Sequence, residues 1–376
     1  MVYFDSAAST KPRTEILDSF LKSNQECFAN PSSAHALGRE ADRRLDAARK
    51  KILDAFRLPA QYQVAFLSGA TEANNLAIKG VAFSYQNRGK KLLFSTVEHP
   101  SVLEPIRYLA EHFGFIPVPL AVDSLGRVSL DTLRKAMDKD VILVSIMGAN
   151  NETGAVNDLA SLGTIVHEYP KAFFHSDLTQ AIGKMDIPFS SLDLFSYSAH
   201  KIHGVKQSGA LIYKSSMRLV PCLHGGGQER GLRSGTGSVA LDESLALATS
   251  LAMSSAHQAT AHVRALWQRL RDGLQEEPVL LNSTEEGSPY ILNFSLRNHK
   301  ASVIMEALSQ KGFYVSTMSA CSERTDQASA TLLAMGLPKE LAGNAIRVSF
   351  SEDNTLEEVD AFLSHLHQIL KEVHPR

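Results

Sequence analysis

Short apolar runs alternate with amphipathic helical patterns up to about residue 240 of the chain. One helical stripe steps by three or four residues through Leu37, Ala41, Leu45, Ala48, Ile52 and Phe56, with Arg and Lys on the other faces. Apolar runs predict buried strands at 64–67, 92–95, 115–118, 141–147, 173–176, 194–197 and 209–213. Strands that alternate with helices in this way favour a mostly parallel sheet with helices on both faces.

The pattern changes after about residue 239. A long helix rich in Ala and Leu is predicted over 241–274. Later apolar runs alternate with helices, at 290–296, 313–316 and 345–350. This texture predicts a smaller α+β domain packed on the first. We therefore divide the chain into a large domain with an N-terminal arm, residues 1–247, and a small C-terminal domain, residues 248–376.

Composition narrows the classes of partner. The chain carries 38 basic and 40 acidic side chains, a formal net charge of -2, so no global field attracts nucleic acid or an anionic membrane. No apolar run approaches the ~18 residues that a membrane span needs, and a signal-peptide pattern is lacking. Cys27, Cys222 and Cys321 are widely separated, which argues against a disulfide framework and a zinc site. We expect a cytoplasmic protein without a metal, a nucleic-acid partner or a membrane partner.

The candidate chemistry centres on Lys201. A buried strand over 193–197 leads into the loop Ser198-Ala-His-Lys-Ile-His-Gly204, and the next strand begins at Gly209. A lysine held at a strand end between a hydroxyl and an imidazole is placed to lose its proton and attack a carbonyl as an amine. The alternative is a surface lysine in a turn, since lysines are almost never fully buried.

Further segments place polar groups after predicted strands, where the functional groups of such sheets collect. The turn at 68–72 offers helix N-terminal N–H groups and the Thr71 hydroxyl to a phosphate, or is an ordinary helix cap. His99 could cover a planar ring, although a lone histidine there is more often structural. Asp177, with Gln180 three residues later, needs a cationic partner such as a protonated ring nitrogen, because burying an unpaired carboxylate is costly.

An amine, a phosphate cradle, a ring-covering imidazole and a carboxylate for a pyridinium nitrogen are together what pyridoxal 5'-phosphate (PLP) requires. In this setting the chain resembles the cysteine desulfurases of the class V aminotransferase group over almost its whole length. The resemblance is carried by Tyr3-Phe-Asp-Ser-Ala-Ala8, Asn30-Pro-Ser-Ser33 with His35, 68–78, Glu98-His99, 150–154, Asp177 with Gln180, 198–204, 225–231, 233–236, 319–321 and 346–349. It implies the fold-type I arrangement of PLP enzymes, with a mostly parallel seven-stranded sheet and a smaller α+β C-terminal domain.

The resemblance also implies how the cofactor is bound. Lys201 would be the Schiff-base lysine, His99 would stack on the ring, and Asp177 would pair with the pyridine nitrogen. Gln180 would hydrogen-bond the phenolic oxygen. The phosphate would be held by Ala70, Thr71, Ser198 and His200, and by Thr236 from the other subunit of a homodimer.

For the substrate, the resemblance implies L-cysteine, gripped at its carboxylate by Asn151 and Arg347. Arg347 alternates with apolar neighbours in a strand pattern, so it faces away from them and can offer a bidentate fork. Lys201 would take the Cα proton, and the thiolate of Cys321 would attack the substrate sulfur, leaving a persulfide on the protein and releasing alanine. The sulfur would supply Fe–S clusters, thio-modified tRNA or a thio-cofactor through an acceptor or scaffold protein that docks near Cys321.

Two other functions stay open. A related PLP lyase or aminotransferase would act on selenocysteine, cysteine sulfinate or another small amino acid, and would not need Cys321. A catalytically weak binding scaffold for a sulfur-acceptor protein would not need Lys201, Asp177 and His99, whose presence argues against it.

The chain departs from the family pattern near the lysine and before the cysteine. Ala199 replaces the usual Gly before the His-Lys pair, while Val205 and Gln207 stand in place of the usual Pro and Gly. These replacements alter the rigidity of the turn but keep the chemical groups. Met318 occupies the usual Gly position three residues before Cys321; if that position needs a positive φ, the loop must run differently.

Overall fold

The large sheet has seven strands, as predicted. The computed structural model describes residues 1–317 and 328–374, so Met318 and Cys321 lie outside the described residues. In spatial order the strands are β2 (Tyr62–Leu67), β8 (Gly209–Lys214), β7 (Leu194–Ser198), β6 (Phe173–Asp177), β5 (Val141–Ser145), β3 (Lys91–Ser95) and β4 (Ile116–Leu120). Only β8 runs antiparallel to its neighbours; the other pairs are parallel. The prediction of a mostly parallel sheet is confirmed.

Two strands, β4 and β5, end two residues away from their predicted ends. β4 continues to Leu120 although Pro117 and Pro119 lie within it, which is possible because β4 is an edge strand and pairs on one side only. β5 ends at Ser145, two residues before the end of the apolar run. The residues that follow leave the ladder and line the active-site cavity described below.

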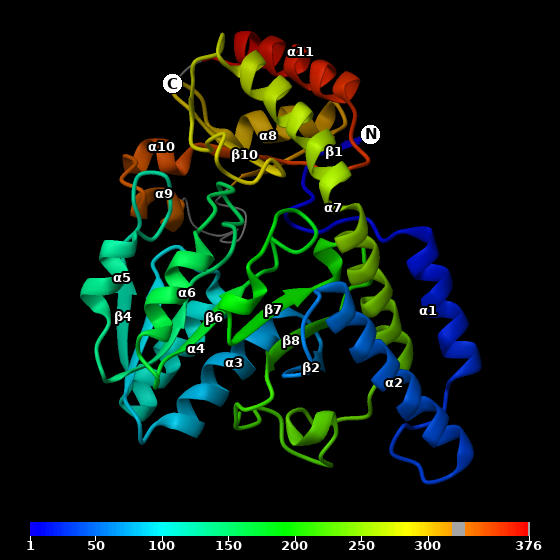
Figure 1. The fold of residues 1–376 in the computed structure, drawn as a ribbon. Coiled ribbons are helices and arrows are strands. Elements are labelled where there is room, and N and C mark those ends of the chain that lie inside the picture. Colours follow the sequence, from blue (N-terminus) through cyan, green and yellow to red (C-terminus); the bar gives the residue numbers. More distant parts are fainter. Residues whose placement is uncertain (318–327, 375–376) are drawn as a thin grey trace.

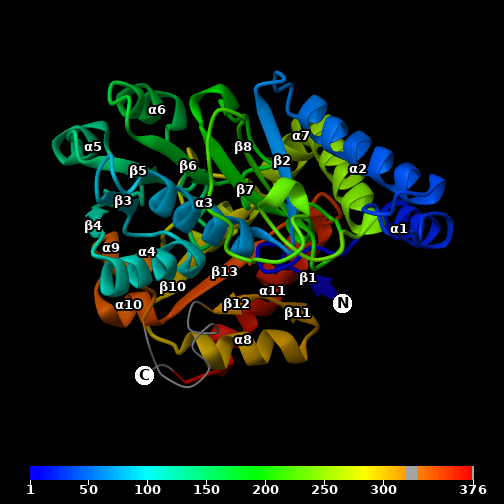
Figure 2. The same cartoon turned by 90° about the horizontal axis from the view of Figure 1, so that it is seen from below.

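Helices cover both faces of this sheet (Figures 1 and 2). Alternate residues of each strand serve the two sides: Val64 and Phe66 pack in one core, and Ala65 and Leu67 in the other. One face is covered by α3 (Ala70–Tyr85) and α4 (Pro100–Phe113). The opposite face is covered by α1 (Thr14–Glu26), α2 (Ala36–Ala55), α5 (Leu130–Ala136), α6 (Leu159–His167) and the first half of α7 (Val239–Leu274).

A second unit is built around a small antiparallel sheet above the first (Figure 1). Its order is β12 (Ser316–Thr317), β13 (Ala345–Ser349), β10 (Ile291–Leu296) and β9 (Val279–Leu281). Its helices are α8 (Ala301–Gln310), α9 (Ala330–Ala334), α10 (Lys339–Gly343) and α11 (Leu356–Glu372). Short 3-10 turns precede α7 in the chain and belong to the part built on the large sheet: η1 (Phe189–Ser191), η2 (Ala199–Lys201) and η3 (Glu229–Gly231).

Two segments join the units. Helix α7 packs Leu245 against the large sheet and buries Trp267 in the core of the small sheet. The N-terminal arm crosses in the other direction: β1 (Val2–Tyr3) pairs in parallel with β11 (Phe313–Tyr314), and Phe4 lies in the second core. The division at residue 247 stays a prediction. In the described parts of the chain, no helix combines the length and the apolar character needed to cross a membrane.

The loop after Lys201 is strained at Gln207. Its backbone has φ 61°, in the left-handed region that favours glycine, and its side chain is exposed. The family pattern has glycine at this position, and the left-handed backbone favours glycine there. In this chain Gln207 adopts the same backbone conformation.

Replacing Gln207 with glycine is expected to stabilise the protein by about 0.5–1 kcal/mol, because relief of the left-handed penalty exceeds the entropy that glycine loses on folding. Urea unfolding of the two proteins measures the difference. Lys206→Gly, at the exposed neighbour whose φ is not positive, is the matched control and should be destabilising. Equal destabilisation by both changes would refute the strain.

Candidate active site

A cavity of about 520 Å³ lies where the carboxyl ends of β6 and β7 meet the small sheet. Its wall includes Lys201, which follows β7, and Arg347, which lies on β13 of the small sheet. Most of the predicted site residues line it: Ala70, Thr71, His99, Asn151, Asp177, Gln180, Ser198, His200, Lys201 and Arg347. Thr236 does not line it and is exposed on a loop of this chain, while Cys321 is outside the described residues.

An anion cradle forms at the N-terminus of α3. Gly69 precedes the helix with φ 152°, where a side chain would be strained, and a Cβ there would lie 3.2 Å from Ser198 Oγ. The backbone N–H of Ala70 donates to Ser198 Oγ over 2.7 Å. The first N–H groups of a helix have no acceptor within it, so those of α3, with the Thr71 and Ser198 side chains beside them, suit a phosphate.

Asp177 presents a buried carboxylate at the end of β6. Its Oδ1 accepts a hydrogen bond from the N–H of Thr179 (2.9 Å), and its Oδ2 accepts one from Asn74 Nδ2 (2.8 Å). Nearby, Glu98 Oε1 accepts from the N–H of Met147 (2.7 Å). Burial, together with the charge of Asp177, raises the pKa of Glu98 well above its ordinary value. Glu98 therefore tends to stay a neutral acid beside the charged Asp177.

The two histidines of the site are held neutral. His99 is the N-cap of α4 and faces the cavity, where partial burial lowers the pKa of its imidazole despite the opposing charge of Asp177. His200, in η2, has its pKa lowered to about 4 by burial and by the charges of nearby lysines. A neutral imidazole at His99 has an uncharged face to lay on a planar ring.

The N-terminal arm holds the lysine. The Lys201 ammonium donates to the carbonyl oxygens of Ala7 (2.5 Å) and Ala8 (2.9 Å). Gln180 Nε2 donates to the same Ala7 oxygen over 2.9 Å. Behind them, Lys184 Nζ donates to Gln180 Oε1 over 3.2 Å and lies over the ring of Tyr290 at 5.6 Å. Both ends of the Gln180 amide are thereby fixed in orientation.

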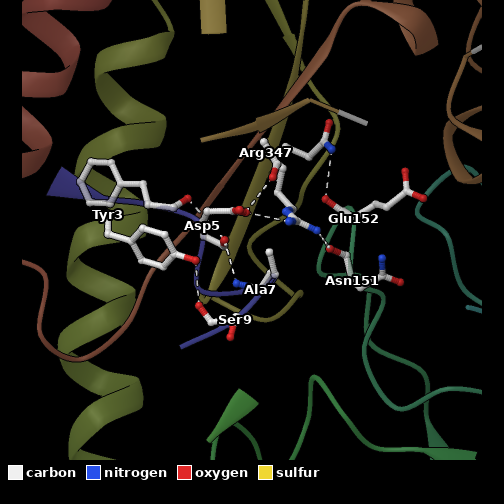
Figure 3. Close-up of polar contacts among 12 residues, drawn as sticks. Tyr3, Asp5, Ala7, Ser9, Asn151, Glu152 and Arg347 are labelled. Atoms are coloured by element: carbon white, nitrogen blue, oxygen red, sulfur yellow. Dashed lines mark hydrogen bonds and ion pairs between the residues drawn. The ribbon is translucent and has the colours of Figure 1, made fainter. Parts of the chain in front are cut away.

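Arg347 also lines the cavity, and Figure 3 shows its contacts with Asp5 and Asn151. It alternates along β13 with Ile346 and Val348, which pack in the small core, so the predicted outward orientation is confirmed. Its Nη2 pairs with Asp5 Oδ1 at 2.8 Å, and its Nη1 donates to the Asn151 carbonyl at 2.8 Å. Arg347 is 7% exposed as a whole residue, so the position of its remaining donors is set by these partners.

The model of the aminotransferase class-V family matches residues 2–362. The chain belongs to this family. Cysteine desulfurase IscS of Methanosarcina thermophila is 36% identical over 376 residues, which cover 99% of this chain and 92% of that protein. A solved NifS-like protein matches with a TM-score of 0.92 and 35% identity, covering 99% of this chain and 100% of the other. A structure titled SspA in complex with cysteine matches with a TM-score of 0.81 and 30% identity, covering 94% and 100%.

The class-V aminotransferase family is PLP-dependent, so the predicted family, fold class and cofactor are confirmed. The residues present fit that cofactor. The cavity combines the α3 cradle for a phosphate, an amine at Lys201 and a buried carboxylate at Asp177. The two hydrogen-bond donors to that carboxylate described above, Asn74 and Thr179, are both neutral. The roles of the individual residues stay predictions.

Asp5, Asn74 and Lys184 each bond a residue that lines the cavity, and none of them had a predicted role. Asp5 and Asn74 lie inside the quoted motifs, but their partners are distant in sequence. Lys184 follows Gln180 by four residues. This spacing indicates a contact between their side chains only once the chain is known to turn there.

Lys184 generates a pH-dependent prediction. Burial, and then the charges of Lys201 and Arg347, lower its pKa to about 7. In the unfolded chain a lysine titrates near 10.4, so between about pH 7 and 10 the unfolded state binds more protons and the folded state gains stability as the pH rises, by up to about 1.4 kcal/mol per pH unit.

Urea unfolding of the cofactor-free wild type and of Lys184→Met should therefore diverge with pH. The wild type is expected to gain relative to the variant on going from pH 7 to pH 9. Lys135→Met, at an exposed position, controls for the loss of one lysine from the chain. A wild-type-to-Lys184→Met difference that stays constant with pH would show that Lys184 titrates normally.

Proposed function

We propose that this chain converts L-cysteine to L-alanine and transfers the sulfur to Cys321 as a persulfide. The enzyme class, a PLP-dependent cysteine desulfurase, follows from the near full-length similarity to cysteine desulfurases. The observation that supports the residue roles is that one cavity holds Lys201, Asp177 and His99 together with Arg347. A set suited to the cofactor thus faces a guanidinium suited to an amino-acid carboxylate.

Arg347 and Asn151 orient the substrate in this proposal. The carboxylate of L-cysteine binds the guanidinium of Arg347, which Asp5 and the Asn151 carbonyl hold in place. The substrate amine then points toward the lysine side of the cavity. Lys184, packed behind Gln180, lies close enough to Lys201 for the charge of Lys201 to lower the pKa of Lys184.

The bound cofactor supplies an electron sink for the Cα–H and Cβ–S bonds of the substrate. Lys201, as a neutral amine, takes the Cα proton. The thiolate of Cys321 then attacks the substrate sulfur: an S–S bond forms, the C–S bond breaks, and its electron pair stays with the carbon fragment. That fragment gains protons and leaves as alanine. The protein retains the transferred sulfur as a persulfide.

The homodimer and the sulfur acceptor also belong to this proposal. The phosphate cradle of one protomer is completed by the partner subunit's Thr236; the exposure of this side chain, away from its own cavity, supports that assignment. An acceptor or Fe–S scaffold protein takes the persulfide at a docking site near Cys321.

Alanine release and persulfide formation from L-cysteine are the direct test. The PLP-loaded wild type should make both, while Cys321→Ala should form no persulfide and lose nearly all alanine formation. Cys222→Ala, which removes an exposed cysteine outside the cavity, should match the wild type. If Cys321→Ala releases alanine at the wild-type rate, Cys321 is not the acceptor, and a lyase acting on another small amino acid is favoured.

Arg347→Lys tests the substrate grip. A lysine keeps the charge but loses the fork, at a cost of about 1.5–3 kcal/mol, so KM for L-cysteine should rise roughly 10- to 100-fold while PLP affinity changes little. Steady-state kinetics and a PLP titration measure the two quantities. Arg269→Lys, at a surface ion pair with Asp360, is the control. An unchanged KM would place the substrate carboxylate elsewhere.

A further inference from the structure

Asn74 is a fully buried asparagine whose polar groups are all engaged. It lies on α3, four residues after Ala70, so it projects from the same helical face toward the sheet. Its Nδ2 donates to Asp177 Oδ2 and to Ser101 Oγ, each over 2.8 Å, and its Oδ1 accepts from the Ser196 hydroxyl.

The chemistry of these partners fixes which way the amide stands. The reverse orientation would turn the Oδ1 lone pairs toward the Asp177 carboxylate, so the NH₂ group must face that side. An amide has two N–H bonds, and both are committed, one to Asp177 and one to Ser101. Asn74 thereby joins β6 to the first turn of α4.

Ser101 carries the connection to His99. Because its oxygen accepts from Asn74, its own proton is available for His99 Nδ1, which lies 2.8 Å away. The backbone N–H of Ser101 also donates to His99 Nδ1, over 3.1 Å. Two donors converge on this nitrogen, so it carries no proton, and the proton of the neutral imidazole is on Nε2.

We propose that Asn74 is a positioning residue that couples Asp177 to His99 and, through Ser101, keeps the imidazole proton on Nε2. The proposal rests on the proposed function, because it assigns a purpose to the two groups on either side of the cofactor ring. Helix α3 then sets three features of the site at once: the phosphate cradle at its first turn, the ionised partner of the ring nitrogen, and the tautomer of the ring-covering imidazole.

The charged groups around His99 agree with this tautomer. Asp177 favours a second proton on the ring, whereas burial and the charge of Lys201 oppose it. The balance lowers the pKa of His99, so the ring is neutral at physiological pH and has a single proton to place.

Asn74→Asp tests the coupling with little change in volume. The substitution replaces the NH₂ group by a carboxylate oxygen, so the Ser101 hydroxyl turns toward the new acceptor and presents its lone pairs to His99. The hydroxyl oxygen, 2.8 Å from Nδ1, can then accept a hydrogen bond from it and outweigh the longer backbone N–H contact of 3.1 Å, so the proton of His99 should move to Nδ1. Asn75→Asp adds the same charge at the next position of α3, where the amide bonds only the Thr71 carbonyl on the contacts given, and is the matched control.

Long-range ¹H–¹⁵N spectra of the holoenzyme with ¹⁵N-labelled histidine give the readout, with His99→Gln to identify the signal. Support requires an unprotonated Nδ1 in the wild type and in Asn75→Asp, and a protonated Nδ1 in Asn74→Asp. A wild-type His99 protonated at Nδ1, or at both nitrogens at neutral pH, overturns the proposal. So does a folded, PLP-loaded Asn74→Asp with an unchanged ring.

Ser101→Ala keeps the test decisive if Asn74→Asp does not fold. It removes one of the two donors that oppose protonation of Nδ1, so the NMR titration midpoint of His99 should rise; an unchanged midpoint contradicts the relay. None of these readouts needs L-cysteine turnover. A wild type that releases no alanine but shows the predicted tautomers would refute the proposed function and leave the role of Asn74 standing.

Discussion

The buried carboxylate of Asp177 is the constraint on which the rest of the site depends. It stands at the end of the central strand of the large sheet, where an unpaired charge costs several kcal/mol. Thr179 and Asn74 donate hydrogen bonds to it, but both donors are neutral. Burial and the charge of Asp177 raise the pKa of the neighbouring Glu98, so Glu98 keeps its proton and adds no second negative charge beside Asp177. A protonated ring nitrogen would bring to this carboxylate the opposite charge that these two neutral donors do not supply.

The N-terminal arm ties the two halves of the cavity together. Its anchor is in the small unit, where β1 pairs with β11 and Phe4 is buried. From there it places Asp5 against Arg347 and the Ala7 carbonyl against Lys201. Arg347 and Lys201 are thus bonded to positions two residues apart in the chain, which limits how far the small unit can shift relative to the large one without breaking either contact.

The sequence predicted what depends on local pattern. Uniform apolar runs identified the strands of the large sheet, and polar residues just after them identified Lys201, Asp177 and His99, because a parallel sheet brings its strand ends to one edge. Asp5 and Asn74 escaped this reasoning. Asp5 pairs with Arg347, which lies 342 positions later in the chain, and Asn74 looks like any polar helix residue until β6 and α4 supply its partners. Thr236 was predicted from the resemblance. It is exposed and does not line the cavity of its own chain, so a single chain offers no contact that would have identified it.

The stretch that carries Cys321 lies outside the described residues, but its two flanks are informative. Ser316, just before it, donates to Asp5 Oδ1, the oxygen that also pairs with Arg347. Ser329, just after it, donates to Glu152, which adjoins Asn151. Both flanks are therefore bonded to the neighbours of the substrate-carboxylate grip. If the substrate carboxylate binds Arg347 as proposed, it joins the same hydrogen-bonded group that holds Ser316 and Ser329, the described residues on either side of that stretch.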